Sequence, residues 1–199
     1  MYGTLLGTRG VGAILGFFLA GRLSRFDPKV VMTLGFSIQA LSGVHMMTFD
    51  MNVGIADVMV ASFMQGASVG LVWVPLVVAT FATLERRYLA ETTAVFHLLR
   101  NVGSSIFISI SVTMVIRTGT SNYARMTEFV SPFNEILSFP QYLNFWDTDT
   151  TTGLARIAEL VSNQADMIGF LNAFGLYTLA SVLVLPLIWM VRMPRRDAN

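Results

Sequence analysis

Long apolar stretches separated by short polar segments dominate the chain. Five of them are long enough to cross a bilayer, whose hydrocarbon core needs about 20 mostly apolar residues per helix. They lie at about residues 2–20, 30–49, 55–80, 93–116 and 168–191. The strict alternation of apolar and polar positions that marks a transmembrane β-strand does not run through them. The pattern therefore predicts an all-α polytopic membrane protein with five transmembrane helices.

Basic residues in the connecting segments set the expected orientation, because Lys and Arg are enriched in cytoplasmic loops. Basic residues follow the first, third and fifth stretches, at Arg22, Arg25, Lys29, Arg86, Arg87, Arg192, Arg195 and Arg196. The segment 117–167 instead carries more acidic than basic residues. We therefore expect a cytoplasmic C-terminus and a long extracytoplasmic loop at 117–167. Within that loop, apolar residues at helical spacing over 154–161 predict an amphipathic segment on the membrane surface or over a vestibule.

An odd number of helices would place residue 1 outside the cell. Residues 1–20 lack the basic n-region of a secretory signal, so nothing in the first stretch explains that placement. We therefore interpret residues 1–199 as a partial C-terminal transmembrane domain of a larger membrane protein, or as a truncated relative of one.

Composition excludes several classes of function. Of the 199 residues, 54% are hydrophobic and only 13% are charged, whereas a soluble domain carries about a quarter charged residues. The net charge of +1 is too small for electrostatic binding of nucleic acid. With no cysteine, the chain has no disulfide framework, thiol nucleophile or thiolate metal site. A soluble enzyme and a nucleic-acid-binding protein are therefore not expected.

Polar residues inside the first, third and fourth stretches mark candidate positions on a transport pathway. Lipid cannot satisfy such groups, so they belong at contacts between helices or beside water. In the fourth stretch, steps of four residues join a polar row at His97, Asn101, Ser105, Ser109 and Thr113. The candidate pathway residues are Arg9, Gln65, Arg100, Asn101 and Ser105. Close helix packing alone remains an equal alternative, and the second and fifth stretches are expected to face lipid.

Two residues within the stretches have specific expected consequences. Arg100 is costly inside a membrane, and it could either bond lipid headgroups and helix ends or take part in coupling to substrate or protons. Pro75 is expected to kink the third helix, because proline removes a backbone hydrogen bond.

Signals for catalysis are weak. Residues 66–70 match the G-x-S-x-G nucleophile pattern, but they lie inside an apolar helical stretch rather than between a strand and a helix. We interpret them as a packing face of small residues. The chain has no phosphate-binding P-loop and no H-E-x-x-H motif. We therefore expect no enzymatic activity, no cofactor and no bound metal.

Several segments together resemble a known family of transporters. They are residues 8–12 (TRGVG), 21–29 (GRLSRFDPK), 65–76 with its QGASVG and VPL segments, 99–106 (LRNVGSSI) and 164–174. They are similar to the C-terminal part of the fourteen-helix drug:proton antiporters of the EmrB/QacA type, in the major facilitator superfamily. The chain departs from that pattern in a basic loop one residue shorter, in the absence of an aspartate before Arg22, and at Phe107, where glycine is usual.

The resemblance implies that the five helices are the last five of fourteen, with the first, third and fourth lining the central cavity. It implies a proton-coupled exporter of lipophilic drugs or toxic compounds in the bacterial inner membrane, with the loop 117–167 in the periplasm. Its expected partners are a lipophilic substrate, protons, membrane lipid, the N-terminal half of the transporter and a periplasmic adaptor protein. The segment expected to act as a cytoplasmic gate contains Gly21, Arg22, Arg25, Asp27 and Lys29.

Two alternatives to this function stay open. The chain could be a truncated membrane protein that does not transport but associates with a larger transporter. It could also be a subunit of an oligomeric channel. The sequence names neither a substrate nor a proton-carrying carboxylate, because no acidic residue lies deep in a predicted span.

Overall fold

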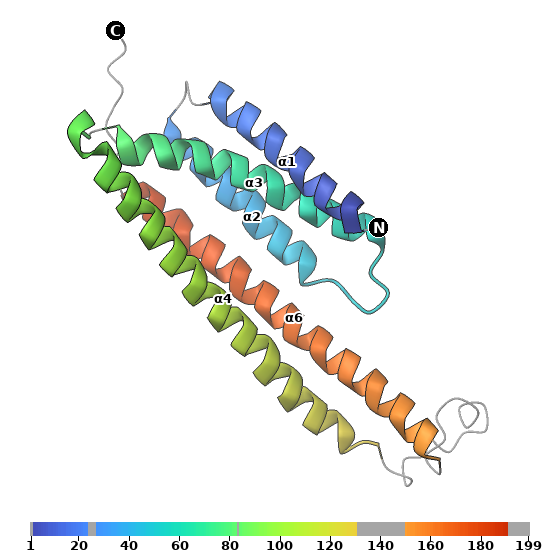
Figure 1. Ribbon diagram of the computed structural model, residues 1–199. Helices are drawn as coiled ribbons and strands as arrows, with labels where there is room; N and C mark the ends of the chain where they lie inside the picture. Colours follow the sequence, from blue (N-terminus) through green and yellow to red (C-terminus); the bar gives the residue numbers. More distant parts are fainter. Residues whose placement is uncertain (1, 24–26, 83, 131–149, 191–199) are drawn as a thin grey trace. The chain divides into compact units, whose positions relative to one another are not determined.

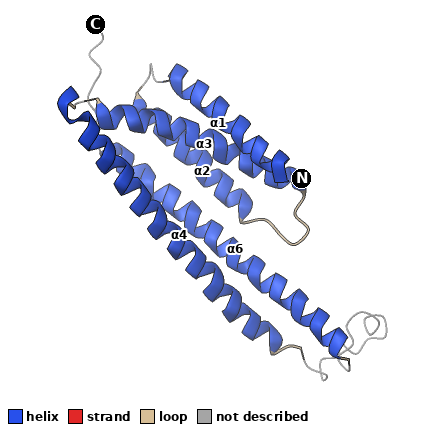
Figure 2. Ribbon diagram, viewed as in Figure 1, coloured by secondary structure: helices blue, strands red, loops and turns tan. Residues whose placement is uncertain are grey.

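The structure is a computed structural model that describes residues 2–23, 27–82, 84–130 and 150–190 (Figure 1). These residues form helices and no strands (Figure 2), which confirms the all-α fold class. The elements are α1 (Tyr2–Leu23), α2 (Pro28–Met46), α3 (Ile55–Phe81), the short 3₁₀ helix η1 (Arg86–Tyr88), α4 (Leu89–Thr127) and α6 (Thr151–Met190). Four of the helices, α1, α3, α4 and α6, are long and apolar enough to cross a membrane. The chain is thus a multi-pass membrane protein, and a span through the 19-residue α2 stays a prediction.

The described residues divide into two compact units. The first contains α1, α2, α3, the beginning of α4 up to Ile106 and the end of α6 from Phe174. The second, Phe107–Ala173, contains the rest of α4 and the beginning of α6.

Glycines bring the backbones of α1 and α3 together in the first unit. Gly12 and Gly16 of α1 lie one helical turn apart, as do Gly66 and Gly70 of α3. A Cβ atom on any of the four would overlap backbone atoms of the facing helix, for example the Ala67 carbonyl opposite Gly16. Pairs of small residues four apart are a recurrent means of close helix packing in membranes.

The serine of the G-x-S-x-G segment is also buried between helices. Ser68 is fully buried, and its hydroxyl lies 2.8 Å from the Gln65 carbonyl oxygen and 3.2 Å from Gln39 Oε1 of α2. Ser68 lies two residues from Gly66 and from Gly70, so it faces α2 on the opposite side of the helix from the glycines that pack against α1. The interpretation of residues 66–70 as a packing face is confirmed.

Helix α2 packs against α3 over one face, which its apolar sequence did not indicate. Its first turn is held by Asp27, whose carboxylate accepts a 2.9 Å hydrogen bond from the Lys29 backbone N–H. One face of α2 then lies on α3, where Gly35 meets Val72 and the buried Ser42 donates to the Ala61 carbonyl at 3.1 Å. The expectation that this stretch faces mainly lipid is wrong for this face, because its small residues allow a close approach that its apolar composition does not reveal.

The end of α6 packs on α2 in the same unit. Gly43 of α2 fits against Thr178, and Gly175 of α6 faces the side chain of Met47. Both contacts use glycine on one helix and a larger side chain on the other, so α2 contacts both α3 and this part of α6.

Helices α4 and α6 extend further than the predicted spans. They contain 39 and 40 residues, about twice the number that a bilayer core requires. The expected loop at 117–167 is therefore helical at both ends, over 117–127 and from Thr151 onward. The expected surface segment at 154–161 is the beginning of α6 rather than a separate element. Residues 131–149 lie outside the described residues.

Direct packing explains why these extensions stay helical. In the second unit, Gly119 of α4 faces Asp166 of α6, and Gly169 of α6 faces the backbone of Val115. Charged residues near position 117 led the sequence to predict a loop, but a helix outside the membrane tolerates charge when a second helix covers one of its faces.

Substitution of Gly16 tests how much the α1–α3 contact contributes to stability. We expect Gly16→Ala to lower the free energy of unfolding by about 1–3 kcal/mol, because the backbones must separate. The matched control is Gly7→Ala in the same helix, where no atom lies within 4 Å of the added Cβ. It should be neutral or stabilising by less than about 1 kcal/mol. Thermal loss of helical circular dichroism in detergent measures both, and equal melting temperatures for the two variants would contradict the prediction.

Candidate functional site

The part of α4 in the first unit is almost uncovered. Arg100, Asn101 and Ser105, three of the predicted pathway residues, are all exposed. The only buried residue in the whole helix is Gly119, which belongs to the second unit. Helix α4 nevertheless has the composition of a membrane helix. Lipid cannot supply hydrogen-bond partners for the polar side chains on its exposed surface.

An aromatic cluster joins α4 to α3 around Arg100. The guanidinium carbon of Arg100 lies 4.7 Å from the centre of the Trp73 ring. Phe96, one turn earlier in α4, lies 6.0 Å from Trp73, 5.7 Å from Phe81 and 5.7 Å from His97, measured between ring centres. Such pairs are favourable in edge or tilted geometry, and a guanidinium over an indole face is attracted to the ring quadrupole. Nothing in the sequence pattern distinguishes Trp73 or Phe96 from the other apolar residues of these membrane helices.

Arg9 and Gln65 lie at a different level of the same unit. The backbone carbonyl of Arg9 faces Gly66, next to Gln65, whereas its side chain is exposed. Gln65 is half-buried, and its amide nitrogen lies 3.3 Å from the Met46 sulfur, a weak acceptor. Trp73 follows Gly66 by seven residues, about 10 Å along the axis of α3. The structure therefore places the predicted pathway residues at two levels rather than in one cluster.

Lys29 of the predicted gating segment reaches the other end of the chain. Its ammonium group donates to the Trp189 carbonyl at 3.3 Å, in the last turn of α6. A cation is favourable there, because the final carbonyls of a helix carry partial negative charge. Asp27 acts locally as the cap of α2.

The remaining residues of that segment show fewer contacts. Gly21 is exposed, and the guanidinium of Arg22 lies 5.8 Å from the centre of the Phe18 ring in the same helix. Arg25 lies outside the described residues. Their role in gating stays a prediction.

Pro75 is buried within α3, and the helix continues through it to Phe81. Because proline has no backbone N–H, the carbonyl of Leu71 lacks its usual partner in the helix.

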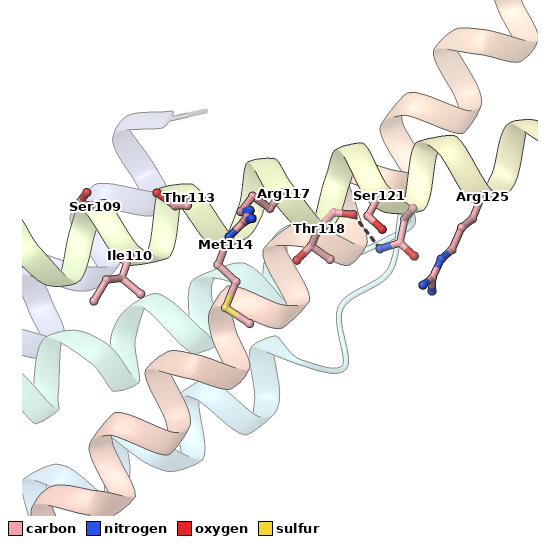
Figure 3. A pocket seen from close by; sticks show the side chains of 9 residues that line it. Ser109, Ile110, Thr113, Met114, Arg117, Thr118, Ser121 and Arg125 are labelled. Carbon is pink, nitrogen blue, oxygen red and sulfur yellow. Dashed lines mark hydrogen bonds between the residues drawn. The ribbon is translucent and has the colours of Figure 1, made fainter.

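The second unit contains an open groove of about 640 Å³ along α4 (Figure 3). Most of its lining residues are polar, and two are arginines. They are Ser109, Ile110, Thr113, Met114, Arg117, Thr118, Ser121, Asn122 and Arg125. The row of polar residues spaced four apart that the sequence revealed at 97–113 therefore continues through Arg117, Ser121 and Arg125. The spacing of four residues is visible in the sequence, but the charged residues after position 116 indicated a loop rather than a longer helix.

This groove lies on the face of α4 that α6 does not cover. Val115 and Gly119 pack on α6, and Arg117 lies two residues from each of them. At about 100° per residue, a separation of two places Arg117 on the opposite side of the helix. Among the described residues of this unit, α6 is the helix that packs on α4, and the polar face is turned away from that contact.

Comparison with known proteins gives three informative relatives. The chain is 25% identical over 172 residues to the multidrug export protein EmrB of Haemophilus influenzae, which covers 85% of this chain and 34% of that protein. It is 22% identical to the fatty acid resistance protein FarB of Neisseria gonorrhoeae, over 91% of this chain and 37% of FarB. It is 25% identical to EmrB of Escherichia coli K12, over 88% of this chain and 35% of that protein. No protein-family profile and no solved structure matches the chain significantly.

The relatives cover most of this chain, whereas the chain covers only about a third of their length. That proportion fits the C-terminal portion inferred from the resemblance. The chain is therefore a homologue of the EmrB-type drug exporters of the major facilitator superfamily.

Proposed function

We propose that this chain forms part of a proton-coupled transporter of the bacterial inner membrane that exports lipophilic drugs or other toxic compounds. The relatives are multidrug export and fatty acid resistance proteins, which supports export of small apolar molecules. In this proposal the C-terminus is cytoplasmic and the segment 117–167 is periplasmic.

The observation that carries the proposal is the uncovered polar surface of α4. Arg100, Asn101 and Ser105, all in the first unit, are exposed. A lipid-facing helix would place apolar side chains there, because each charged group at the membrane centre costs about 2.5–3.5 kcal/mol on insertion scales. A water-filled cavity satisfies these groups instead.

A cavity of this kind needs a second wall. Transporters of this superfamily alternate access by rocking two halves around a site near the middle of the membrane. The chain corresponds to about a third of its relatives, so the rest of such a protein would provide the opposing wall and the proton-carrying carboxylate.

The contact between Lys29 and Trp189 suits a gate at the cytoplasmic end. It joins the beginning of α2 to the end of α6 through one hydrogen bond on an exposed side chain. Such a bond contributes little to stability and can break and re-form as helices move. A periplasmic adaptor would bind on the periplasmic side of the membrane, away from this cytoplasmic gate.

Transport by the intact protein tests the proposal directly. Proteoliposomes with an imposed pH gradient should accumulate a lipophilic dye, and a protonophore should abolish the accumulation. Asn101→Leu should reduce transport strongly without loss of protein, since the variant removes a polar group from the pathway. Val102→Leu, the neighbouring exposed apolar position, should transport normally. Accumulation that ignores the pH gradient would contradict proton coupling, and equal transport by both variants would contradict the role of Asn101.

Cysteine substitution tests whether the groove of α4 faces water. The chain has no native cysteine, so a single introduced thiol reports its own environment. Thr113→Cys should react with a membrane-impermeant maleimide at least about tenfold faster than Ile116→Cys, because the reactive thiolate forms only where water reaches it. Ile116 is also exposed on α4 but apolar, and it does not line the groove. Equal labelling rates would show that both faces meet the same solvent.

A further inference from the structure

The last turn of α2 contains a histidine, His45, whose ring nitrogen Nε2 is buried. The residue as a whole is half-buried, and Nε2 has no hydrogen-bond partner among the described residues. Buried polar atoms are almost always hydrogen-bonded, so an exception requires an explanation. We propose that His45 is a proton-responsive residue, and that protonation of its ring loosens the contact between the end of α2 and α6.

Aromatic contacts connect this ring to α6. The His45 ring meets Phe49 edge-to-face, with ring centres 5.4 Å apart and ring planes at 82°. Phe49 meets Phe174 of α6 in the same manner, at 6.5 Å and 80°. The turn after α2 positions Phe49, whose backbone N–H donates to the Met46 carbonyl at 3.2 Å. The three rings therefore form a continuous contact from α2 to α6 within the first unit.

A neutral imidazole suits this site. It carries one hydrogen, on either of its nitrogens, and the other nitrogen is an acceptor only. With the hydrogen on Nδ1, the buried Nε2 of His45 presents a lone pair and needs no acceptor beside it. Burying an unpaired neutral acceptor costs free energy, but less than burying an unpaired charged donor.

Protonation changes what the surroundings must supply. The charged ring carries a hydrogen on both nitrogens, so Nε2 of His45 becomes a donor. In the described parts of the chain no group is placed to accept that hydrogen. Because an unpaired buried charge is costly, we expect the ring to turn toward water. Phe49 then loses one of its two ring contacts, which weakens its packing on Phe174.

Titratable and charged groups around α2 do not offset this cost. They are Lys29 in α2, Asp27 and Asp50 at its ends, Asp57 on α3, Tyr177 on this part of α6, and Arg9 and Arg22 on α1. None of them forms a hydrogen bond with the buried Nε2. Asp50, the nearest carboxylate along the chain, accepts a 2.8 Å hydrogen bond from the Asn52 backbone N–H. It is exposed, so a ring that has turned outward can meet it together with water.

The location of His45 gives this response a place in the proposed transport cycle. Basic residues precede α2, and His45 lies at its other end, beside the turn that leads to α3. In the proposed orientation this end faces the periplasm, the side from which a proton-driven exporter takes up protons. Histidine is the side chain that ordinarily changes charge between pH 5 and 8. The inference rests on the proposed function only for this side of the membrane, and the pH response itself does not depend on transport.

Fluorine NMR tests the proposal on the full chain in detergent micelles. A single 4-fluorophenylalanine at position 174 reports the contact of α6 with Phe49. His97→Gln leaves His45 as the only histidine of the chain, and purification uses a tag without histidine. We expect the fluorine resonance to shift between pH 8 and pH 5, following the titration of one proton.

Three variants show whether His45 and Phe49 cause the shift. His45→Gln and His45→Phe remove the titrating group, and His45→Phe retains an aromatic ring beside Phe49. In both, the pH-dependent shift should be roughly tenfold smaller or absent. Phe49→Leu keeps His45 but interrupts the row of rings, so it should also suppress the shift at position 174. Far-UV circular dichroism checks that each protein remains helical at both pH values.

Several outcomes would overturn the proposal. A resonance that does not move in the chain with native His45, or that moves equally in either His45 variant, would show that this histidine does not control the contact. An undiminished shift in Phe49→Leu would show that the effect does not pass through Phe49. The measurement involves no transport, so a failure of the export assay would leave its result standing, and the reverse also holds.

Discussion

The close approach of α1 and α3 is the contact on which the first unit depends. Within lipid, apolar side chains gain little from meeting each other, so helices associate where their backbones approach closely and pack well. Gly12 and Gly16 supply that approach from one helix, and Gly66 and Gly70 supply it from the other. The same face of α3 cannot then take part in catalysis or bind a ligand, because backbone atoms fill it. A pattern that resembles a hydrolase motif is thus explained by membrane packing.

One face of α3 packs on α1, and other faces contact α2 and the beginning of α4 through different kinds of side chain. Small residues of α2 again allow close packing, as at Gly35 and Ser42. The contact with α4 instead consists of large aromatic side chains around Trp73 and Phe96. Aromatic contacts leave the backbone of α4 further from α3, so α4 keeps most of its surface uncovered. Uncovered polar groups on an otherwise apolar helix are the physical basis of the proposed pathway.

Sequence patterns predicted the position of α3 well and the lengths of α4 and α6 poorly. The predicted span at 55–80 agrees closely with Ile55–Phe81, because a turn containing Asp50 and Gly54 precedes a long uninterrupted apolar stretch. The prediction failed beyond position 116, where polar and charged residues are typical both of loops and of helices outside the membrane. Hydropathy reports where the membrane ends and not where a helix ends, so the extensions of α4 and α6 required the packing of Gly119 and Gly169 to be known.

The sequence by itself determined that this is an α-helical membrane protein, which residues are small enough for close packing, and which polar residues are expensive in lipid. These properties are local, since they depend on the composition and periodicity of single helices. Only the tertiary structure decided that Arg100 meets Trp73, 27 positions away, and that Lys29 meets the Trp189 carbonyl, 160 positions away. Periodicity defines the faces of each helix but not which faces meet. That choice follows from the packing of all neighbouring helices together.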